Sequence, residues 1–573
     1  MHTLAEAFIQ YAGSDPDAAA VTFGSSALTR SELKGLVLQR IHTFVTQGVQ
    51  PGSSVLLSLP TSIEFVASFW ALQVLGAAAV PTVAIGSGER QPAGLQQVKK
   101  VCSIVNPSAI IAVAGEVDAL KLAMPSIPVL STIDFETLSN TGELPQFNVT
   151  PESLGIIQFT SGSTSDPKGC ALSHAAIMAN AFMLKKSLDL QSGDRSVCWL
   201  PLHHDMGLMC GVIGPVVADA ETHLQSAVRF LANPMSWIDT ISEGGRTHTA
   251  CPNFALSLVL RRLQRKMRST PDLSKLQSIV CGAEIIDAEL VKQFIAALEP
   301  FGLNPKAFRP SYGMAEVTVF ASSETDGLVT ARIPTGLEVG SSILKDSSAK
   351  SVDTSVDIEA RTIEVVSVGK TINGCLSRIV DDSGKALPEN SMGHIQLSSP
   401  SRMQGYLNNA DATAEAFDGE WLITGDIGFK SEDCLFIVGR EKDLIIIGGQ
   451  NIHPTDVESY ICNELNLERR RLAVDRRRDE LGSDEIFIVV ESRPLDNAEA
   501  LTASIKQHCY LSCGFFPAKI YLVKPGFIPR TTSGKIQRNV LRQKVSEPFE
   551  TVTSDTPLAS NAEIMTEAEA SAV

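Results

Sequence analysis

FTSGSTSDPKGC, at residues 159–170, is the most informative stretch of this chain. It places five serine and threonine hydroxyls, two glycines and Lys168 between apolar segments. We expect a strand over Ile156–Phe159 before the loop and a helix over Ala171–Leu184 after it. Such a loop offers backbone N–H groups, hydroxyls and an ammonium group to a ligand rich in negative oxygens, and a nucleoside triphosphate is such a ligand. The alternative is a solvated serine- and glycine-rich linker, which rarely lies between a strand and a helix.

The loop is not a GxxxxGK(S/T) phosphate loop, because neither serine nor threonine follows the lysine. It resembles the phosphate loop of the adenylate-forming superfamily, usually (F/Y)TSG(S/T)TGxPKG, which occurs in acyl-CoA synthetases, peptide-synthetase adenylation domains, luciferases and fatty acyl-AMP ligases. Ser165 replaces the usual glycine, and a positive φ there would strain a serine. The resemblance implies that ATP is bound by Thr160, Ser161, Gly162, Ser163, Thr164 and Lys168.

The composition is that of a globular protein with more than one domain. The chain has 573 residues, of which 44% are hydrophobic and 20% charged. A net charge of −16 argues against broad nucleic-acid binding. The eleven cysteines contain no CxxC pair, which favours a reducing compartment and no zinc site. The first ten residues carry Glu6 and no basic segment, so we expect a cytoplasmic protein without a secretory signal.

One uncharged stretch, Phe65–Gly86, is long enough to imitate a membrane span. Gly76 and Pro81 interrupt it, and β-branched residues follow the glycine. The pattern predicts a buried helix ending near Gly76 and then a buried strand. We therefore expect a soluble protein with no stable membrane insertion.

Apolar helical segments alternate with short β-rich runs through the first three quarters of the chain. This alternation predicts parallel sheets covered by helices. Around Leu435–Glu458 the character changes, because a strand, a turn and a second strand precede a proline-led helix start. The candidate buried strands are Val55–Leu59, Ala109–Ala114, Ile156–Phe159, Val197–Leu200 and Ser278–Cys281.

We predict a large domain over residues 1–438, a small α/β domain over 439–545 and an acidic tail over 546–573. The tail contains no lysine or arginine and is predicted to be disordered. The superfamily resemblance implies the adenylate-forming α/β fold. In that fold the large domain comprises two α/β subdomains and a distorted β-barrel, and the small domain is mobile, here with Lys442 as the hinge.

Two further segments match the nucleotide site of the superfamily. By resemblance, Gly282, Ala283 and Glu284, after the strand SIVC, edge the adenine. Within Ser311-Tyr312-Gly313-Met314-Ala315-Glu316, Tyr312 stacks on the adenine and Glu316 holds Mg²⁺. The chemistry agrees, because a planar base needs an aromatic face and a triphosphate needs a hard cation held by a carboxylate. Taken alone, YGMAE is also compatible with a helix start that carries a surface glutamate.

Three residues nearer the C-terminus complete this match. The Asp426 carboxylate, in WLITGDIG, is suited to accept both ribose hydroxyls, and Arg440, in VGREKD, adds a further hydrogen bond. In the superfamily, the lysine at the position of Lys535, in PRTTSGKIQR, reaches the substrate carboxylate and the α-phosphate during adenylation. Taken alone, the Gly-Asp pair is also compatible with an ordinary turn, and Lys535 with a solvated surface lysine. The order of the motifs favours the functional interpretation.

LPLHHDMGL, at residues 200–208, makes the resemblance specific to fatty acyl-AMP ligases, whose form is LPxYHDMGL. His204 matches the gate residue beside the acyl site, and His203 replaces the tyrosine. A metal site on the two histidines is disfavoured if they are strand neighbours, because such neighbours point to opposite faces. ACPNFA at 250–255 and GGQNIHPTDVE at 448–458 resemble the ligases' APNFAY and GRNHYPxDIE, and Cys170 and Leu256 depart from the family's valine and tyrosine.

The resemblance implies a two-step reaction. A fatty carboxylate attacks the α-phosphate of MgATP to give acyl-AMP and pyrophosphate, and the thiol of an acyl carrier protein then accepts the acyl group in lipid or polyketide/lipopeptide biosynthesis. About fifty residues separate YGMAE from VSVGK, and Gly340–Glu364 is where we place the ligases' insertion that hinders transfer to CoA.

Three alternatives remain. A fatty acyl-CoA synthetase would turn over with CoA as acceptor. The retained Lys168, Glu316, Asp426 and Lys535 argue against a catalytically silent acyl- or nucleotide-binding protein. An amino-acid-adenylating enzyme is less expected, because Asp205, the carboxylate that would face the amine, already belongs to HDMGL.

Overall fold

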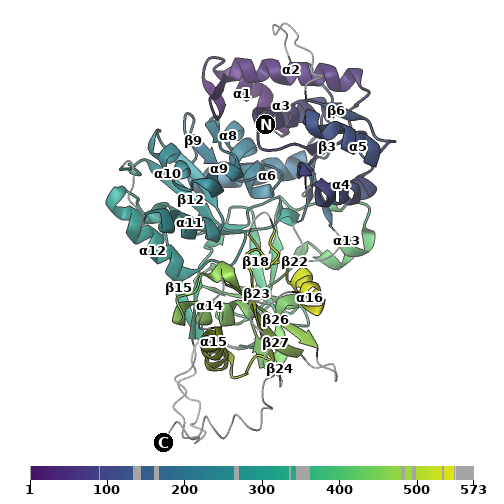
Figure 1. Cartoon of the computed structure of the whole chain (residues 1–573). Coiled ribbons are helices and arrows are strands. Elements are labelled where there is room, and N and C mark those ends of the chain that lie inside the picture. Colours follow the sequence, from purple (N-terminus) through teal and green to yellow (C-terminus); the bar gives the residue numbers. More distant parts are fainter. Residues whose placement is uncertain are drawn as a thin grey trace, which may run out of the picture. The chain divides into compact units, whose positions relative to one another are not determined.

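The computed structural model divides into two compact units (Figure 1). The first comprises Met1–Ala331, Val365–Thr424 and Gly428–Ile437, and the second comprises Arg332–Glu364, Gly425–Ile427 and Val438–Val573. The domain boundaries predicted after residues 438 and 545 and the hinge at Lys442 stay predictions. The structure describes residues 2–88, 91–132, 144–160, 167–263, 270–334, 337–343, 362–447, 450–478, 484–492, 498–531, 534–547 and 549.

One sheet of the first unit has the strand order β20-β8-β7-β4-β3-β5-β6. Its β7-β4-β3-β5-β6 part is parallel, while β8 pairs antiparallel with both β7 and β20. A separate apolar core lies between this sheet and the helices α4 and α5. The strands are β3 (Ser54–Ser58), β4 (Ala78–Thr82), β5 (Ala109–Ala112), β6 (Val129–Ser131), β7 (Leu154–Phe159), β8 (Gly169–Ser173) and β20 (Gly405–Tyr406).

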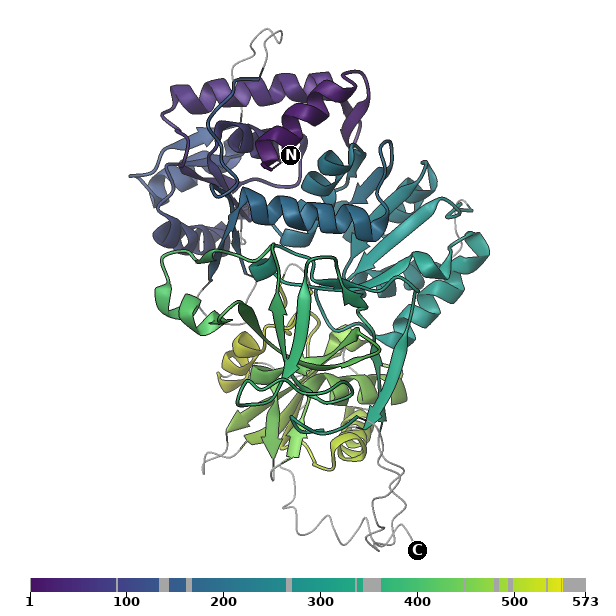
Figure 2. The same ribbon diagram turned by 180° about the vertical axis from the view of Figure 1, so that it is seen from behind.

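A second sheet of the same unit has the order β17-β14-β13-β12-β11-β9-β10-β1-β2. It is parallel from β13 to β1, with antiparallel strands at both edges. Figure 2 shows α6 between the two halves of the unit, where it contacts β7, β8 and α8. The strands are β1 (Ala19–Phe23), β2 (Ser26–Thr29), β9 (Arg195–Cys198), β10 (Glu221–Leu224), β11 (Thr247–Cys251), β12 (Leu276–Cys281), β13 (Phe308–Tyr312), β14 (Ser322–Ser323) and β17 (Lys370–Thr371).

The helices of the first unit cover these two sheets. They are α1 (Leu4–Ser14), α2 (Arg30–Thr46), α3 (Ile63–Leu75), α4 (Gln91–Val105), α5 (Val117–Ala123), α6 (His174–Leu188), α7 (Asp205–Leu208), α8 (Gly214–Ala218), α9 (Ala227–Ala232), α10 (Met235–Ser242), α11 (Asn253–Leu263), α12 (Ala288–Leu298) and α13 (Ala410–Ala416).

A third, antiparallel sheet has the order β18-β19-β22-β21, with β23 also paired to β22. Its strands are β18 (Leu376–Val380), β19 (Gly393–Ser398), β21 (Phe417–Asp418), β22 (Trp421–Ser431) and β23 (Cys434–Arg440). From Trp421 to Asp426, β22 alternates buried positions with half-buried or exposed ones, as expected for a strand with one packed face. Two further strands, β15 (Thr330–Pro334) and β16 (Thr362–Val366), pair with each other.

The second unit is built on a small sheet, β26-β27-β28, with helices packed against it (Figure 1). Its strands are β24 (Ile445–Ile447), β25 (Gln450–Ile452), β26 (Leu472–Arg478), β27 (Asp484–Glu491) and β28 (Lys519–Val523). Its helices are α14 (Pro454–Glu464), α15 (Ala498–Cys513) and α16 (Arg538–Ser546). Proline is the first residue of α14, where its missing N–H has no intrahelical partner to lose.

The stretch that imitates a membrane span folds as predicted. Helix α3 ends at Gly76, whose φ of 79° lies in the left-handed region that glycine tolerates, and the buried strand β4 follows. Of the helices within the described residues, none is both long enough and apolar enough to cross a bilayer.

The helix predicted over Ala171–Leu184 begins later than expected. Residues Gly169–Ser173 form the buried strand β8, which returns antiparallel to β7, so the loop at 159–170 closes a β-hairpin. Ser173 then caps α6 by accepting a hydrogen bond from the Ala176 N–H at 3.2 Å. The prediction was wrong because a short apolar run before a helix is ambiguous by periodicity alone.

Candidate active site

The phosphate-loop lysine and the candidate metal-binding glutamate both contact one tyrosine. Lys168 Nζ lies 4.8 Å from the centroid of the Tyr406 ring, and Tyr406 Oη donates a hydrogen bond to Glu316 Oε1 at 2.8 Å. Glu316 is 8% exposed. Lys168 and Glu316 lie almost 150 positions apart in the sequence, and both contact Tyr406. The sequence motifs did not indicate Tyr406.

Backbone pairing fixes this cluster. Strand β20 pairs with β8 so that Tyr406 lies opposite Cys170, two residues after Lys168. The Met403 N–H donates to the Glu316 carbonyl at 2.8 Å, which ties the chain before β20 to the turn that carries Glu316. The contacts of Tyr406 therefore follow from the sheet, and its position in the sequence gave no signal of them.

A buried amide holds the turn after Glu316. Asn180 on α6 is fully buried; its Nδ2 lies 3.1 Å from the Val317 carbonyl and 2.9 Å from the Phe320 carbonyl, and its Oδ1 accepts from the Phe320 N–H at 3.2 Å. Thr318 within this turn has a φ of 71°, a strained value for a β-branched residue. Such a turn persists because the surrounding hydrogen bonds over-determine it.

The ends of the phosphate loop are joined by a hydrogen bond from the Thr160 N–H to the Lys168 carbonyl at 3.0 Å. This bond continues the β7–β8 ladder and sets Lys168 at the base of the loop. The predicted ligands Ser161, Gly162, Ser163 and Thr164, and the departure at Ser165, lie outside the described residues.

The two predicted adenine-binding segments lie side by side, because β12 and β13 pair in parallel. A Cβ at Gly282 would approach the Ser311 carbonyl to 2.7 Å, so only glycine fits there without a shift. Ala283 has a φ of 72°, and Glu284 Oε1 accepts from the Phe254 N–H at 3.1 Å. Strain of this kind is common where a backbone is shaped around a ligand.

Tyr312 ends β13, and Gly313 follows it. A Cβ at Gly313 would lie 1.6 Å from the Val319 carbonyl, so the chain turns too closely here for any side chain. This glycine allows the chain to fold back toward Glu316 directly after Tyr312.

His203 and His204 lie in a turn before α7, with ring centroids 4.7 Å apart. The reason given above against a metal site, that strand neighbours point apart, is therefore wrong. Among the described residues, however, no group of three or more His, Cys, Asp or Glu side chains is placed to hold a metal ion. Burial, with a contribution from His204, lowers the pKa of His203 to about 3, so His203 is neutral near pH 7.

The candidate gate segment is anchored to the strand that leads into the phosphate loop. Gln158 on β7 donates from Nε2 to the His203 carbonyl at 2.9 Å. A Cβ at Gly207 would lie 2.2 Å from the Pro201 carbonyl, which explains the glycine of HDMGL. A π-helical turn, Met209–Ile213, follows α7, and such turns often occur at functional sites.

The two predicted ribose ligands form an ion pair. Arg440 Nε lies 2.9 Å from Asp426 Oδ1, and Asp426 is 4% exposed. The preceding Gly425 has a φ of 70°, a left-handed value that presents the carboxylate from within strand β22. The ion pair fixes the orientation of the Asp426 carboxylate, whose oxygens are suited to accept hydrogen bonds from hydroxyl groups.

Lys535 lies in a tight turn of the second unit. The Thr531 N–H donates to the Lys535 carbonyl at 2.9 Å, and the Lys535 N–H donates to Thr531 Oγ1 at 3.1 Å. These bonds involve its backbone, and its half-buried side chain contributes nothing to them. Lys168 and Glu316 belong to the first unit.

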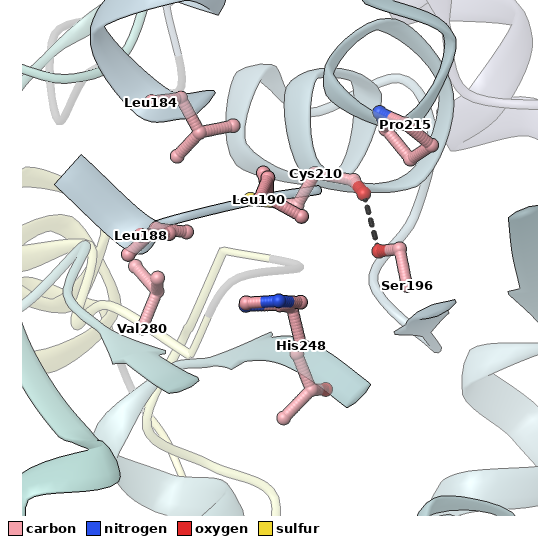
Figure 3. Close-up of a pocket in the computed structure, with 9 residues that line it drawn as sticks. Leu184, Leu188, Leu190, Ser196, Cys210, Pro215, His248 and Val280 are labelled. Carbon is pink, nitrogen blue, oxygen red and sulfur yellow. Dashed lines mark hydrogen bonds between the residues drawn. The ribbon is translucent and has the colours of Figure 1, made fainter. Parts of the chain in front are cut away.

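A small, mostly apolar cavity of about 10 Å³ lies inside the first unit (Figure 3). Cys210 of the π-helical turn borders it, and its carbonyl accepts from Ser196 Oγ at 2.6 Å. His248 also borders it, with Nδ1 2.8 Å from Ser278 Oγ and Nε2 3.0 Å from Asp194 Oδ2. The cavity is lined by Leu184, Leu188, Leu190, Ser196, Cys210, Pro215, His248, Thr249 and Val280.

Residues 8–407 match the family model of AMP-binding enzymes. The chain belongs to this family. It is 30% identical over 517 residues to the long-chain-fatty-acid–AMP ligase FadD26 of Mycobacterium tuberculosis, covering 85% of this chain and 86% of that one. It is 31% identical over 526 residues to a putative acyl-CoA synthetase of Caulobacter vibrioides, covering 90% and 89%.

A solved chain from work on fatty acyl-adenylate ligases of E. coli and L. pneumophila has the same fold. Its TM-score is 0.82 at 27% identity, and the match covers 95% of this chain and 97% of that one. The predicted adenylate-forming fold and the resemblance to fatty acyl-AMP ligases are therefore confirmed. Membership of the AMP-binding enzyme family also supports the prediction that the ligand is an adenosine nucleotide. The roles of the individual site residues stay predictions.

Proposed function

We propose that this AMP-binding enzyme uses MgATP to activate a fatty acid as acyl-AMP, releases pyrophosphate, and transfers the acyl group to the thiol of an acyl carrier protein. The observation that carries the proposal is the contact of both Lys168 and Glu316 with Tyr406, in a chain related to a fatty-acid–AMP ligase. A cation and a carboxylate that contact the same side chain suit a triphosphate and its counter-ion.

In the first step, a carboxylate oxygen of the fatty acid attacks the α-phosphorus of ATP. The bond between the α-phosphorus and its bridging oxygen breaks, and pyrophosphate leaves with the electron pair. Lys168 neutralises the phosphates, the Asp426–Arg440 pair holds the ribose, and Lys535 offsets the charge that develops at the α-phosphate. Mg²⁺ held by Glu316 would supply further charge neutralisation on the phosphates.

ATP–pyrophosphate exchange with fatty acids of graded length tests the first step. We expect exchange that depends on the fatty acid and does not respond to amino acids. Exchange with no fatty acid, or with amino acids only, would overturn the proposal.

The second candidate is a fatty acyl-CoA synthetase, which the relative from Caulobacter vibrioides favours by its name. Transfer assays with CoA and with phosphopantetheinylated carrier protein separate the two candidates. Carrier protein as the faster acceptor supports our proposal, and efficient acyl-CoA formation supports the second candidate. The span proposed to block CoA, Gly340–Glu364, lies mostly outside the described residues.

A further inference from the structure

Tyr406 is the residue on which the contacts of the phosphate-loop lysine and the candidate metal ligand converge. Its ring faces the Lys168 ammonium at 4.8 Å, within the range of a cation–π contact. Its hydroxyl donates a hydrogen bond to Glu316 Oε1 at 2.8 Å. One side chain therefore contacts both charged groups through two different atoms.

The backbone around Tyr406 is fixed independently of these contacts. Its N–H donates to Thr413 Oγ1 at 2.9 Å, and its strand pairs with β8. Gly405 has a φ of 152°, and a Cβ there would lie 2.8 Å from Thr413 Cγ2, so the chain passes close to α13. The phenol is thus presented from a hydrogen-bonded strand, and a donor held in this way can orient a carboxylate.

We propose that Tyr406 is a positioning residue that orients Glu316 toward a nucleotide-bound Mg²⁺ and holds the Lys168 ammonium in place before the triphosphate binds. This inference rests on the proposed function, because it takes Glu316 as the metal ligand. The hydrogen bond to Oε1 restricts the orientation of the carboxylate, and Oε2 is the oxygen that would contact the ion. Loss of such an outer partner of a metal ligand typically lowers metal affinity or activity by about 10–100-fold.

Two variants separate the two contacts. Tyr406→Phe removes the hydroxyl and keeps the ring, so Glu316 loses its donor while Lys168 keeps its aromatic face. Tyr406→Leu removes both. The matched control is Tyr11→Phe, which deletes the hydroxyl of a buried tyrosine of the same unit whose Oη donates to the Ala220 carbonyl at 3.2 Å.

The readout is the affinity for a non-hydrolysable ATP analogue, measured by calorimetry with Mg²⁺ and again with EDTA. In Tyr406→Phe, the enhancement of affinity by Mg²⁺ should fall about tenfold or more, while the affinity in EDTA stays at the wild-type value. Tyr406→Leu should in addition weaken binding in EDTA, and Tyr11→Phe should change neither value. A purely structural tyrosine would lower both affinities together.

A double-mutant cycle with Glu316→Gln provides a second test that does not depend on one variant folding well. If Tyr406 acts through Glu316, the combined variant should show no more loss of Mg²⁺ enhancement than Glu316→Gln alone. Additive losses, or a wild-type enhancement in Tyr406→Phe, would overturn the inference. Because the readout is binding, a wild-type protein that binds MgATP but makes no acyl-AMP would contradict the proposed function and leave the role of Tyr406 open to the same measurement.

Discussion

Lys535→Ala is expected to slow acyl-AMP formation by about 10²–10³-fold while leaving the affinity for ATP nearly unchanged. The ammonium acts on charge that develops at the α-phosphate in the transition state, so its removal raises the barrier more than it weakens the ground state. The turn that carries Lys535 is held by bonds between its backbone and Thr531, which alanine retains. The slower acyl-AMP formation should therefore come from the missing ammonium group and not from a disturbed fold.

The measurement is a single-turnover assay of acyl-AMP at saturating ATP and fatty acid, with nucleotide affinity measured separately. Lys519→Ala is a suitable control, because it removes another lysine of the second unit whose ammonium lies 5.2 Å from the centroid of the Tyr521 ring. Acyl-AMP formation at the wild-type rate in Lys535→Ala would sink the assignment of this lysine.

Glu316→Gln is expected to reduce Mg²⁺-dependent turnover on the order of 10²-fold. A neutral amide binds a hard cation poorly, but its oxygen still accepts the hydrogen bond from Tyr406 Oη, so the change removes charge with little change in shape. Raising the Mg²⁺ concentration should recover part of the activity.

Asp426→Ala provides the contrast to Glu316→Gln. It removes the ribose acceptor, while the Arg440 side chain, which is 38% exposed, keeps its contact with solvent. We expect a higher KM for ATP, a kcat close to that of the wild type, and no rescue by Mg²⁺. If the two variants show the same kinetic defect, the division of roles between metal and ribose is wrong.

The sequence predicted the parts of the fold whose causes are local. Gly76 ends α3 because the chain needs a left-handed residue there, and the apolar runs that became β3, β5, β7, β9 and β12 are short and bounded by turn residues. The helix expected at Ala171 fails for the same local reason, since a buried strand such as β8 and a buried helix start share one apolar pattern.

Long-range contacts were predicted only where a family motif carried them. Asp426 and Arg440 were expected at the same ribose from two motifs about fourteen residues apart, and the structure places them in an ion pair. Tyr406 was not, because its contacts depend on the pairing of β20 with β8, and Asn180 was not, because it acts through a turn some 140 positions away. The contacts of both residues are with partners far away in the sequence, so the local pattern of apolar and polar residues could not predict them.

The central claim is that a carboxylate oxygen attacks the α-phosphorus of ATP, and an isotope label tests it directly. The enzyme is incubated with ATP, an acceptor thiol and a fatty acid that carries ¹⁸O in both carboxylate oxygens, and the nucleotide product is analysed by mass spectrometry. We predict AMP that carries one ¹⁸O atom, because thiol attack on acyl-AMP breaks the bond between the acyl carbon and the transferred oxygen. ADP as the nucleotide product, or ¹⁸O in orthophosphate with unlabelled nucleotide, would contradict the claim.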